Sequence, residues 1–132
     1  MAYLEWTARF SVGDDRIDQQ HQTLFAYVND FHDALAAGVE HALLLQIFDQ
    51  VFAYTQFHFD DEEALMARCN YPDLERHKKL HATLVETVVD LQQALRLEEP
   101  GSEQRAMGFL KNWLQAHVLG VDSKYASYLH SE

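Results

Sequence analysis

The sequence predicts an all-α fold, an up-down-up-down antiparallel four-helix bundle with an extended N-terminal arm. Apolar residues recur at three- and four-residue steps along four stretches of similar length, and short turns separate these stretches. No stretch alternates apolar and polar residues between turn signals, as a half-buried strand would. The chain of 132 residues suits one domain that spans residues 1–132.

The N-terminal residues 1–17 are predicted to form the extended arm. Trp6, Phe10 and Val12 are apolar residues of this segment without helical spacing. They are therefore expected to pack onto the body of the bundle from an extended backbone.

The first helix is predicted over about residues 18–37. Asp18 has a side chain that can cap a helix N-terminus, and Gly38 tolerates the positive φ of a helix C-terminus. Between these ends, the predicted inward face of the helix carries His21 and the apolar residues Leu24, Val28, Phe31 and Leu35.

Three further helices follow, and proline or glycine marks the boundaries between them. Pro72 can end one helix or open the next, and Pro100 with Gly101 lies in an exposed turn. The predicted ranges are about 41–69, 73–97 and 102–120, followed by a short C-terminal segment, 122–132.

The composition of the chain limits which classes of partner and which cellular compartment we expect. The formal net charge of -11 and the pI near 5.0 repel phosphate backbones and anionic lipid, so nucleic acid is not an expected partner. No apolar run approaches the ~18 residues of a membrane span, so no membrane insertion is expected. The single cysteine, Cys69, fits a reducing cytosol, and the N-terminus lacks the layout of a signal peptide. From these two features we expect a cytoplasmic protein. We also expect a monomer, because no exposed apolar stripe indicates a dimer interface.

Histidines interrupt the apolar seams of all four helices. A lone histidine on an apolar face is more often a hydrogen-bonded core residue than a ligand. Burying an imidazole without a partner costs roughly 1–3 kcal/mol of folding free energy, however. Five such costs in one small core would remove much of the stability of the fold. Together these residues are predicted to be metal ligands: His21, His58, His77, His81 and His117.

Helical spacing supports a shared site. His58 and Glu62 are four residues apart, as are His77 and His81. Residues at this spacing differ by only about 40° around the helix axis and share one face. Each pair can therefore reach the same metal site, and Glu62 adds a carboxylate to the predicted ligand set.

Asp122 is the second predicted carboxylate ligand, but its spacing is irregular. It follows His117 by five residues, which is about 140° of rotation on a regular helix. We therefore expect the fourth helix to loosen into a π-like bulge or to end early, with Gly120 supplying the backbone freedom.

The ligand types narrow the metal. The zinc protease motif would place glutamate directly after the first histidine of its pair, where this chain has Lys78. Five imidazoles argue against calcium and magnesium and favour iron, with manganese, cobalt or zinc as substitutes. Seven protein ligands exceed the capacity of one ion. If Glu62, Asp122 and a solvent oxygen bridge two ions, the ion with three histidines is saturated and the other keeps one position open.

With these residues the chain resembles the bacterial hemerythrins, a family of oxygen-binding di-iron proteins. The resemblance covers nearly the whole chain, and its segments are specific as an ordered set. They are Trp6 and Val12-Gly13 in the arm, Ile17-Asp18-Gln19-Gln20-His21, His58-Phe59-Asp60-Asp61-Glu62-Glu63, Tyr71-Pro72 before His77 and His81, and His117-Val118 before Asp122.

The resemblance implies a single hemerythrin-like domain that holds two non-haem, oxo- or hydroxo-bridged iron ions. It implies that three histidines bind the saturated iron and that His21 and His58 bind the open one. The three are His77, His81 and His117, with Glu62 and Asp122 as bridges. The implied function is reversible dioxygen binding for transport or storage, and not an enzyme activity. The alternatives are an oxygen or redox sensor and a di-iron oxidase or peroxide- or nitric-oxide-consuming activity.

An apolar wall around the open iron would keep water and protons from the bound dioxygen. Leu114 and Val118 flank His117 and are the first candidates for this dioxygen pocket. Trp113 and Phe25 are further candidates, for which ordinary core packing is an equal alternative.

Overall fold

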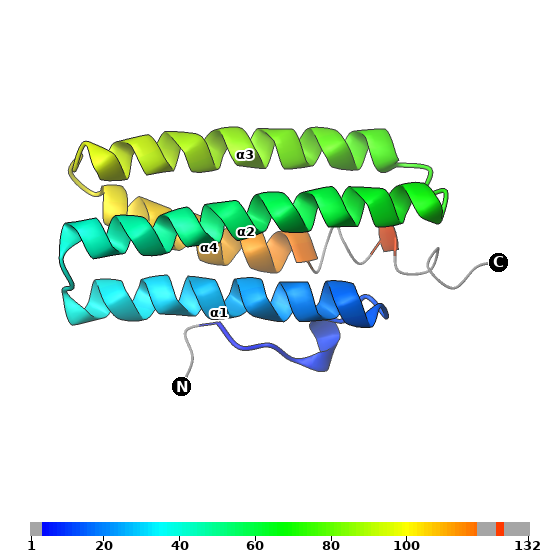
Figure 1. Ribbon diagram of the computed structural model, residues 1–132, viewed down its shortest axis with the longest axis horizontal. Helices are drawn as coiled ribbons and strands as arrows, with labels where there is room; N and C mark the ends of the chain where they lie inside the picture. The colour runs from blue at the N-terminus through cyan, green and yellow to red at the C-terminus, as the bar shows by residue number, and fades with distance from the viewer. Residues whose placement is uncertain (1–3, 119–123, 126–132) are drawn as a thin grey trace.

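The computed structural model describes residues 4–118 and 124–125, and within these residues the protein consists of helices and turns with no strand. The four α-helices are α1 (Asp15–Ala37), α2 (His41–Arg68), α3 (Leu74–Arg96) and α4 (Ser102–Ala116). Consecutive helices run antiparallel, and α1 also packs against α4, which closes the bundle (Figure 1). The predicted all-α four-helix bundle is confirmed.

The core lies along the inward faces of the helices. Leu24, Val28 and Phe31 of α1 are fully buried, and the Phe31 ring meets the Phe48 ring of α2 with centroids 5.7 Å apart. These positions recur every three or four residues, which is why one side of α1 can be apolar throughout. Burial of each such side chain contributes roughly 1.5–3 kcal/mol to the stability of the bundle.

The first helix begins earlier than the predicted start at residue 18. Asp14 caps it, because the Asp14 carboxylate accepts a hydrogen bond from the backbone N–H of Ile17. Asp18 lies inside the first turn, where its carboxylate accepts hydrogen bonds from the Ser11 hydroxyl and the Val12 N–H, at 2.5 and 2.8 Å. The prediction of Asp18 as the N-cap is therefore wrong, and Asp18 ties the arm to the helix instead.

The N-terminal arm runs along α1 (Figure 1). The backbone of Leu4 exchanges two hydrogen bonds with the Asn29 side chain, each 2.8 Å long. Trp6 packs against Phe10 and Phe25, with ring centroids 5.6 and 5.4 Å apart. The arm departs from the predicted extended course at a short 3-10 turn, η1 (Ala8–Phe10). That turn brings the Phe10 side chain back onto the bundle.

The C-terminal ends of α1 and α4 differ in how the helix stops. Gly38 closes α1 with φ +68°, a left-handed conformation that glycine adopts without strain. The α-helical pattern of α4 ends at Ala116 and gives way to a π-type turn at His117 and Val118, and the predicted end at residue 120 lies outside the described residues. Gly120 and Asp122, on which the predicted irregularity was based, lie outside the described residues. Among the described helices, none combines the length and apolarity needed to cross a membrane.

Candidate metal centre

Six of the seven predicted ligands lie together in the interior of the bundle. Each of the four helices supplies at least one of them or leads directly into one, and all are at least nine-tenths buried. They are His21 from α1, His58 and Glu62 from α2, His77 and His81 from α3, and His117 from the turn that follows α4. The seventh, Asp122, lies outside the described residues.

The Glu62 carboxylate lies between two groups of histidines. Its Oε1 atom is 3.2 Å from Nε2 of His77, 3.0 Å from Nε2 of His81 and 3.9 Å from Nε2 of His117. Its Oε2 atom is 3.6 Å from Nε2 of His21 and 3.4 Å from Nε2 of His58. Within each group, one ligand atom per residue lies within 4.8 Å of the others. One carboxylate therefore faces a three-histidine group with one oxygen and a two-histidine group with the other.

Glu62 is ionised in this environment. Complete burial opposes the charged carboxylate most strongly, but attraction to the surrounding imidazoles, first to His58 and then to His117 and His21, outweighs that opposition. The net effect holds the pKa of Glu62 well below its usual range. A permanent negative charge thus lies at the centre of the cluster.

Hydrogen bonds fix which nitrogen of two imidazoles faces Glu62. Nδ1 of His58 lies 2.7 Å from the amide oxygen of Gln20, and Nδ1 of His81 lies 2.8 Å from a carboxylate oxygen of Glu63. Since both partners are acceptors, each Nδ1 carries the proton and donates it. The Nε2 atoms of both rings then point at Glu62.

This arrangement of donor atoms fits a metal ion. With the proton of His58 and of His81 on Nδ1, a metal ion can take the place of any proton on Nε2, and the Nε2 lone pair then binds it beside the ionised carboxylate. Nε2 of His81 is also only 3.2 Å from Nε2 of His117. Without a metal this contact is a hydrogen bond with one proton between the two nitrogens, and a metal ion that both lone pairs bind would replace that proton. Imidazole nitrogen with a shared carboxylate suits iron, zinc or a similar transition metal better than calcium or magnesium.

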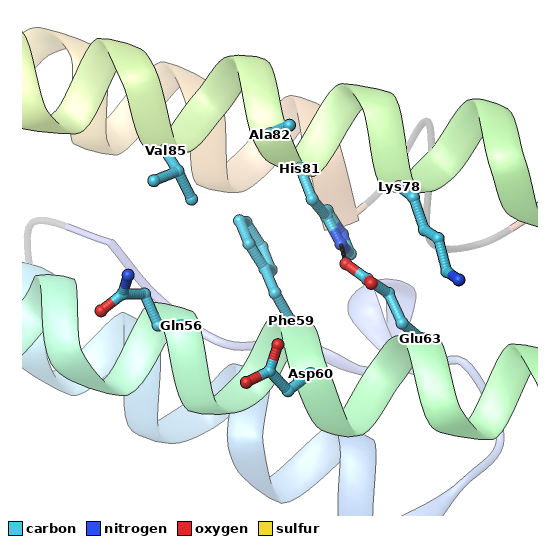
Figure 2. A pocket seen from close by; sticks show the side chains of 8 residues that line it. All are labelled: Gln56, Phe59, Asp60, Glu63, Lys78, His81, Ala82 and Val85. Carbon is cyan, nitrogen blue, oxygen red and sulfur yellow. Dashed lines mark hydrogen bonds and ion pairs between the residues drawn. The ribbon is translucent and has the colours of Figure 1, made fainter.

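The rear of the His81 ring is also held in place. The Phe59 ring stacks on it, with centroids 3.7 Å apart and an interplanar angle of 2°. Figure 2 shows both rings beside a pocket of about 390 Å³ between α2 and α3, with Glu63 pointing toward His81 and Lys78 at its edge. The stacked ring and the Glu63 carboxylate together restrict rotation of the imidazole.

Two contacts of the cluster are missing from the sequence interpretation. The Tyr125 hydroxyl donates a 2.7 Å hydrogen bond to Oε2 of Glu62, and no role at the site was expected for Tyr125 from the sequence. Gln20 accepts from His58, as described above, and was not singled out. The available signals are weak: a buried tyrosine needs a partner for its hydroxyl, and Gln20 directly precedes a predicted ligand.

The four residues predicted to form the dioxygen pocket are all buried in the main apolar core. The Trp113 ring lies 6.2 Å from the His117 ring, beside the three-histidine group. Phe25 packs against Trp6, whose ring lies 6.4 Å from the His21 ring of the two-histidine group. Leu114 and Val118 are each 1% exposed.

Comparison with known proteins gives consistent matches along almost the whole chain. The family described as "Hemerythrin HHE cation binding domain" matches residues 12–129. The bacteriohemerythrin of Methylococcus capsulatus is 35% identical, over 98% of this chain and 98% of its own length. The myohemerythrin of Theromyzon tessulatum is 31% identical, over 95% of this chain and 92% of its own length. A crystal structure of wild-type hemerythrin superposes with a TM-score of 0.89 at 33% identity, covering 98% of this chain and 100% of that chain.

Proposed function

The chain belongs to the hemerythrin family, and from that premise we propose that its buried cluster holds two iron ions and binds dioxygen reversibly, for oxygen transport or storage. The observation that supports two metal positions best is the placement of Glu62. Its two carboxylate oxygens face two different histidine groups, at Nε2 distances of 3.0–3.9 Å and 3.4–3.6 Å. A carboxylate in this position can bridge two ions.

The unequal histidine groups explain where dioxygen would bind. In the proposed arrangement His77, His81 and His117 would hold one ion, His21 and His58 would hold the other, and the ions would share the carboxylates of Glu62 and Asp122. The second ion then has one protein ligand fewer and keeps a position for dioxygen. When bound, the two irons supply the electrons that dioxygen takes up and returns.

The residues of this chain would position the ligands and exclude water. Glu63 and Gln20 hold His81 and His58 in the orientation that directs Nε2 inward, and Tyr125 donates to the carboxylate that faces both groups. The candidate wall around the open position is formed by buried apolar side chains, which keep out water and protons and so favour release of intact dioxygen. We assign this wall to Leu114, Val118, Trp113 and Phe25, of which Phe25 packs on Trp6 beside His21 and Trp113 lies nearer His117.

We further assign the protein to the cytoplasm as a monomer that binds dioxygen without turning it over. The single cysteine supports a reducing compartment such as the cytoplasm. Turnover of dioxygen, peroxide or nitric oxide under excess reductant would instead support a catalytic role. A protein partner that binds only one oxidation state would support a sensor.

Loss of single ligands tests the proposal. The wild-type protein, H58A and H32A are loaded anaerobically with ferrous iron, and iron content and dioxygen uptake are measured. His32 is the control because its side chain is 35% exposed and lies outside the cluster. We expect wild type and H32A to take two irons and one dioxygen per chain, and H58A to lose dioxygen uptake. Equal uptake by H58A would contradict the proposal.

A further inference from the structure

A chain of hydrogen bonds connects the surface of the protein to His58. The Arg16 guanidinium donates from Nε to Oδ2 of Asp61 at 2.5 Å. The Gln20 amide nitrogen donates to the same Oδ2 at 2.6 Å, and Nδ1 of His58 lies 2.7 Å from the Gln20 amide oxygen. The side chain of Arg16 is 66% exposed and that of Asp61 25%, whereas His58 is 1% exposed. The chain thus runs from solvent to the two-histidine group in three steps.

Each step fixes the orientation of the next. A carboxylate can only accept, so Asp61 draws the amide NH₂ of Gln20 toward itself and turns the amide oxygen toward His58. That oxygen accepts the Nδ1–H of His58. The proton of His58 is thereby held on Nδ1, and Nε2 is left to bind a metal. Without Asp61 the Gln20 amide could rotate and present its NH₂ group to His58, which would favour the wrong tautomer.

The equivalent acceptor in the three-histidine group has a different charge. There, Nδ1 of His81 donates directly to the Glu63 carboxylate. A carboxylate acceptor raises the basicity of a metal-bound imidazole, and a neutral amide does so less. The two metal positions therefore differ in their outer partners as well as in their number of histidines.

We propose that Gln20 is a positioning residue for the metal ion of the two-histidine group, and that Asp61, held by Arg16, keeps its amide in the competent orientation. A surface ion pair thus sets how tightly the second metal is bound, while the first metal depends on Glu63. The inference rests on the proposed two-metal function. It assigns to Gln20, Asp61 and Arg16 the control of metal affinity at the two-histidine group.

An effect on folding alone is a poor explanation of this geometry. Arg16 is mostly exposed, and exposed ion pairs add little to folding stability. Gln20, in contrast, is buried and uses both ends of its amide, one toward Asp61 and one toward His58. A role in orienting His58 accounts for both contacts.

The test is a Co²⁺ titration of the full-length, metal-free protein, followed by calorimetry and by the visible cobalt spectrum. The variant is D61A, and the matched control is D60A. Asp60 is the preceding residue of α2, is exposed, and lines the α2–α3 pocket (Figure 2). Both substitutions remove one negative charge at adjacent positions of one helix, so they share their effects on net charge and on helix propensity.

The expected result is specific to one metal. The three-histidine group has more ligands and fills first, so D61A should leave the first Co²⁺ unchanged and weaken the second by about tenfold, the usual scale for loss of an outer partner. D60A should leave both unchanged. Q20M, which keeps the size of the side chain and removes the amide, should reproduce the loss for the second Co²⁺.

Three outcomes would overturn the inference. D61A and D60A could behave alike, D61A could weaken both metals equally, or Q20M could bind both metals as wild type does. In each case a wild-type protein that takes two Co²⁺ leaves the proposed function standing. A wild-type protein that takes fewer than two refutes the two-metal function itself, and the inference with it.

Discussion

The hydrogen bond from Tyr125 to Glu62 predicts a destabilisation that depends on the metal. Tyr125 and Glu62 are both fully buried, and the hydroxyl lies 2.7 Å from Oε2. Y125F removes the hydroxyl and retains the ring, so the packing against Tyr71, with centroids 6.0 Å apart, is preserved. The change therefore removes the charge-assisted hydrogen bond to Glu62 and keeps the ring contact.

The magnitude follows from the charge of the acceptor. Hydrogen bonds to charged groups contribute about 1.5–3 kcal/mol, and water cannot replace this one because Glu62 is buried. In the metal-free protein Y125F should therefore lower the free energy of unfolding by about 2 kcal/mol. In the metal-loaded protein the carboxylate charge is neutralised by the ions, and the loss should fall to about 1 kcal/mol, as for a neutral hydrogen bond.

Urea denaturation of both forms, followed by circular dichroism, measures this difference. Y27F is the control, since Tyr27 is a half-buried residue of α1 whose ring packs on Tyr54. We expect Y27F to change the free energy of unfolding by less than about 0.5 kcal/mol. The reasoning fails if Y125F costs the same with and without metal, or no more than Y27F.

Three further predictions concern the cluster and the core. L114A should accelerate conversion to the ferric, oxygen-inert form, measured as the autoxidation rate, while L95A, at another fully buried position, should not; equal rates would remove Leu114 from the dioxygen pocket. E62A should reduce bound iron below two per chain, measured by elemental analysis, and retention of two irons would exclude Glu62 as a bridge. F31A should lower the free energy of unfolding by about 3–5 kcal/mol and leave the optical spectrum of the iron centre unchanged, and a changed spectrum would show that the apolar core and the centre are coupled.

Much of the fold could be predicted because the apolar seams repeat within each helix. The information for Leu24, Val28 and Phe31 is local, and the structure buries all three. The start of α1 could not be predicted in the same way, because Asp14 and Asp18 are equally suitable as caps. The choice depends on Ser11 and Val12, which bind the Asp18 carboxylate from the arm. Such a contact has no periodic signature.

In the candidate site, too, local features could be predicted from the sequence and contacts between distant residues could not. The four-residue spacing within the pairs His58/Glu62 and His77/His81 could be read from the sequence, and the structure brings both pairs into the cluster. The contacts that orient them join residues far apart in sequence. Gln20 and Asp61 are 41 residues apart, and Glu62 and Tyr125 are 63 apart. Their pairing depends on the relative rotation of neighbouring helices, which one sequence does not specify.

The most direct test of the central claim is the optical spectrum of the ferrous-loaded protein before air is admitted, after air, and again under argon, with bound dioxygen measured in parallel. The account predicts a visible charge-transfer band that appears in air with one dioxygen per two irons and disappears under argon, over repeated cycles. A spectrum that passes directly to a ferric form and does not return under argon would contradict reversible dioxygen binding. In that case the catalytic or sensor role would be the better account of the site.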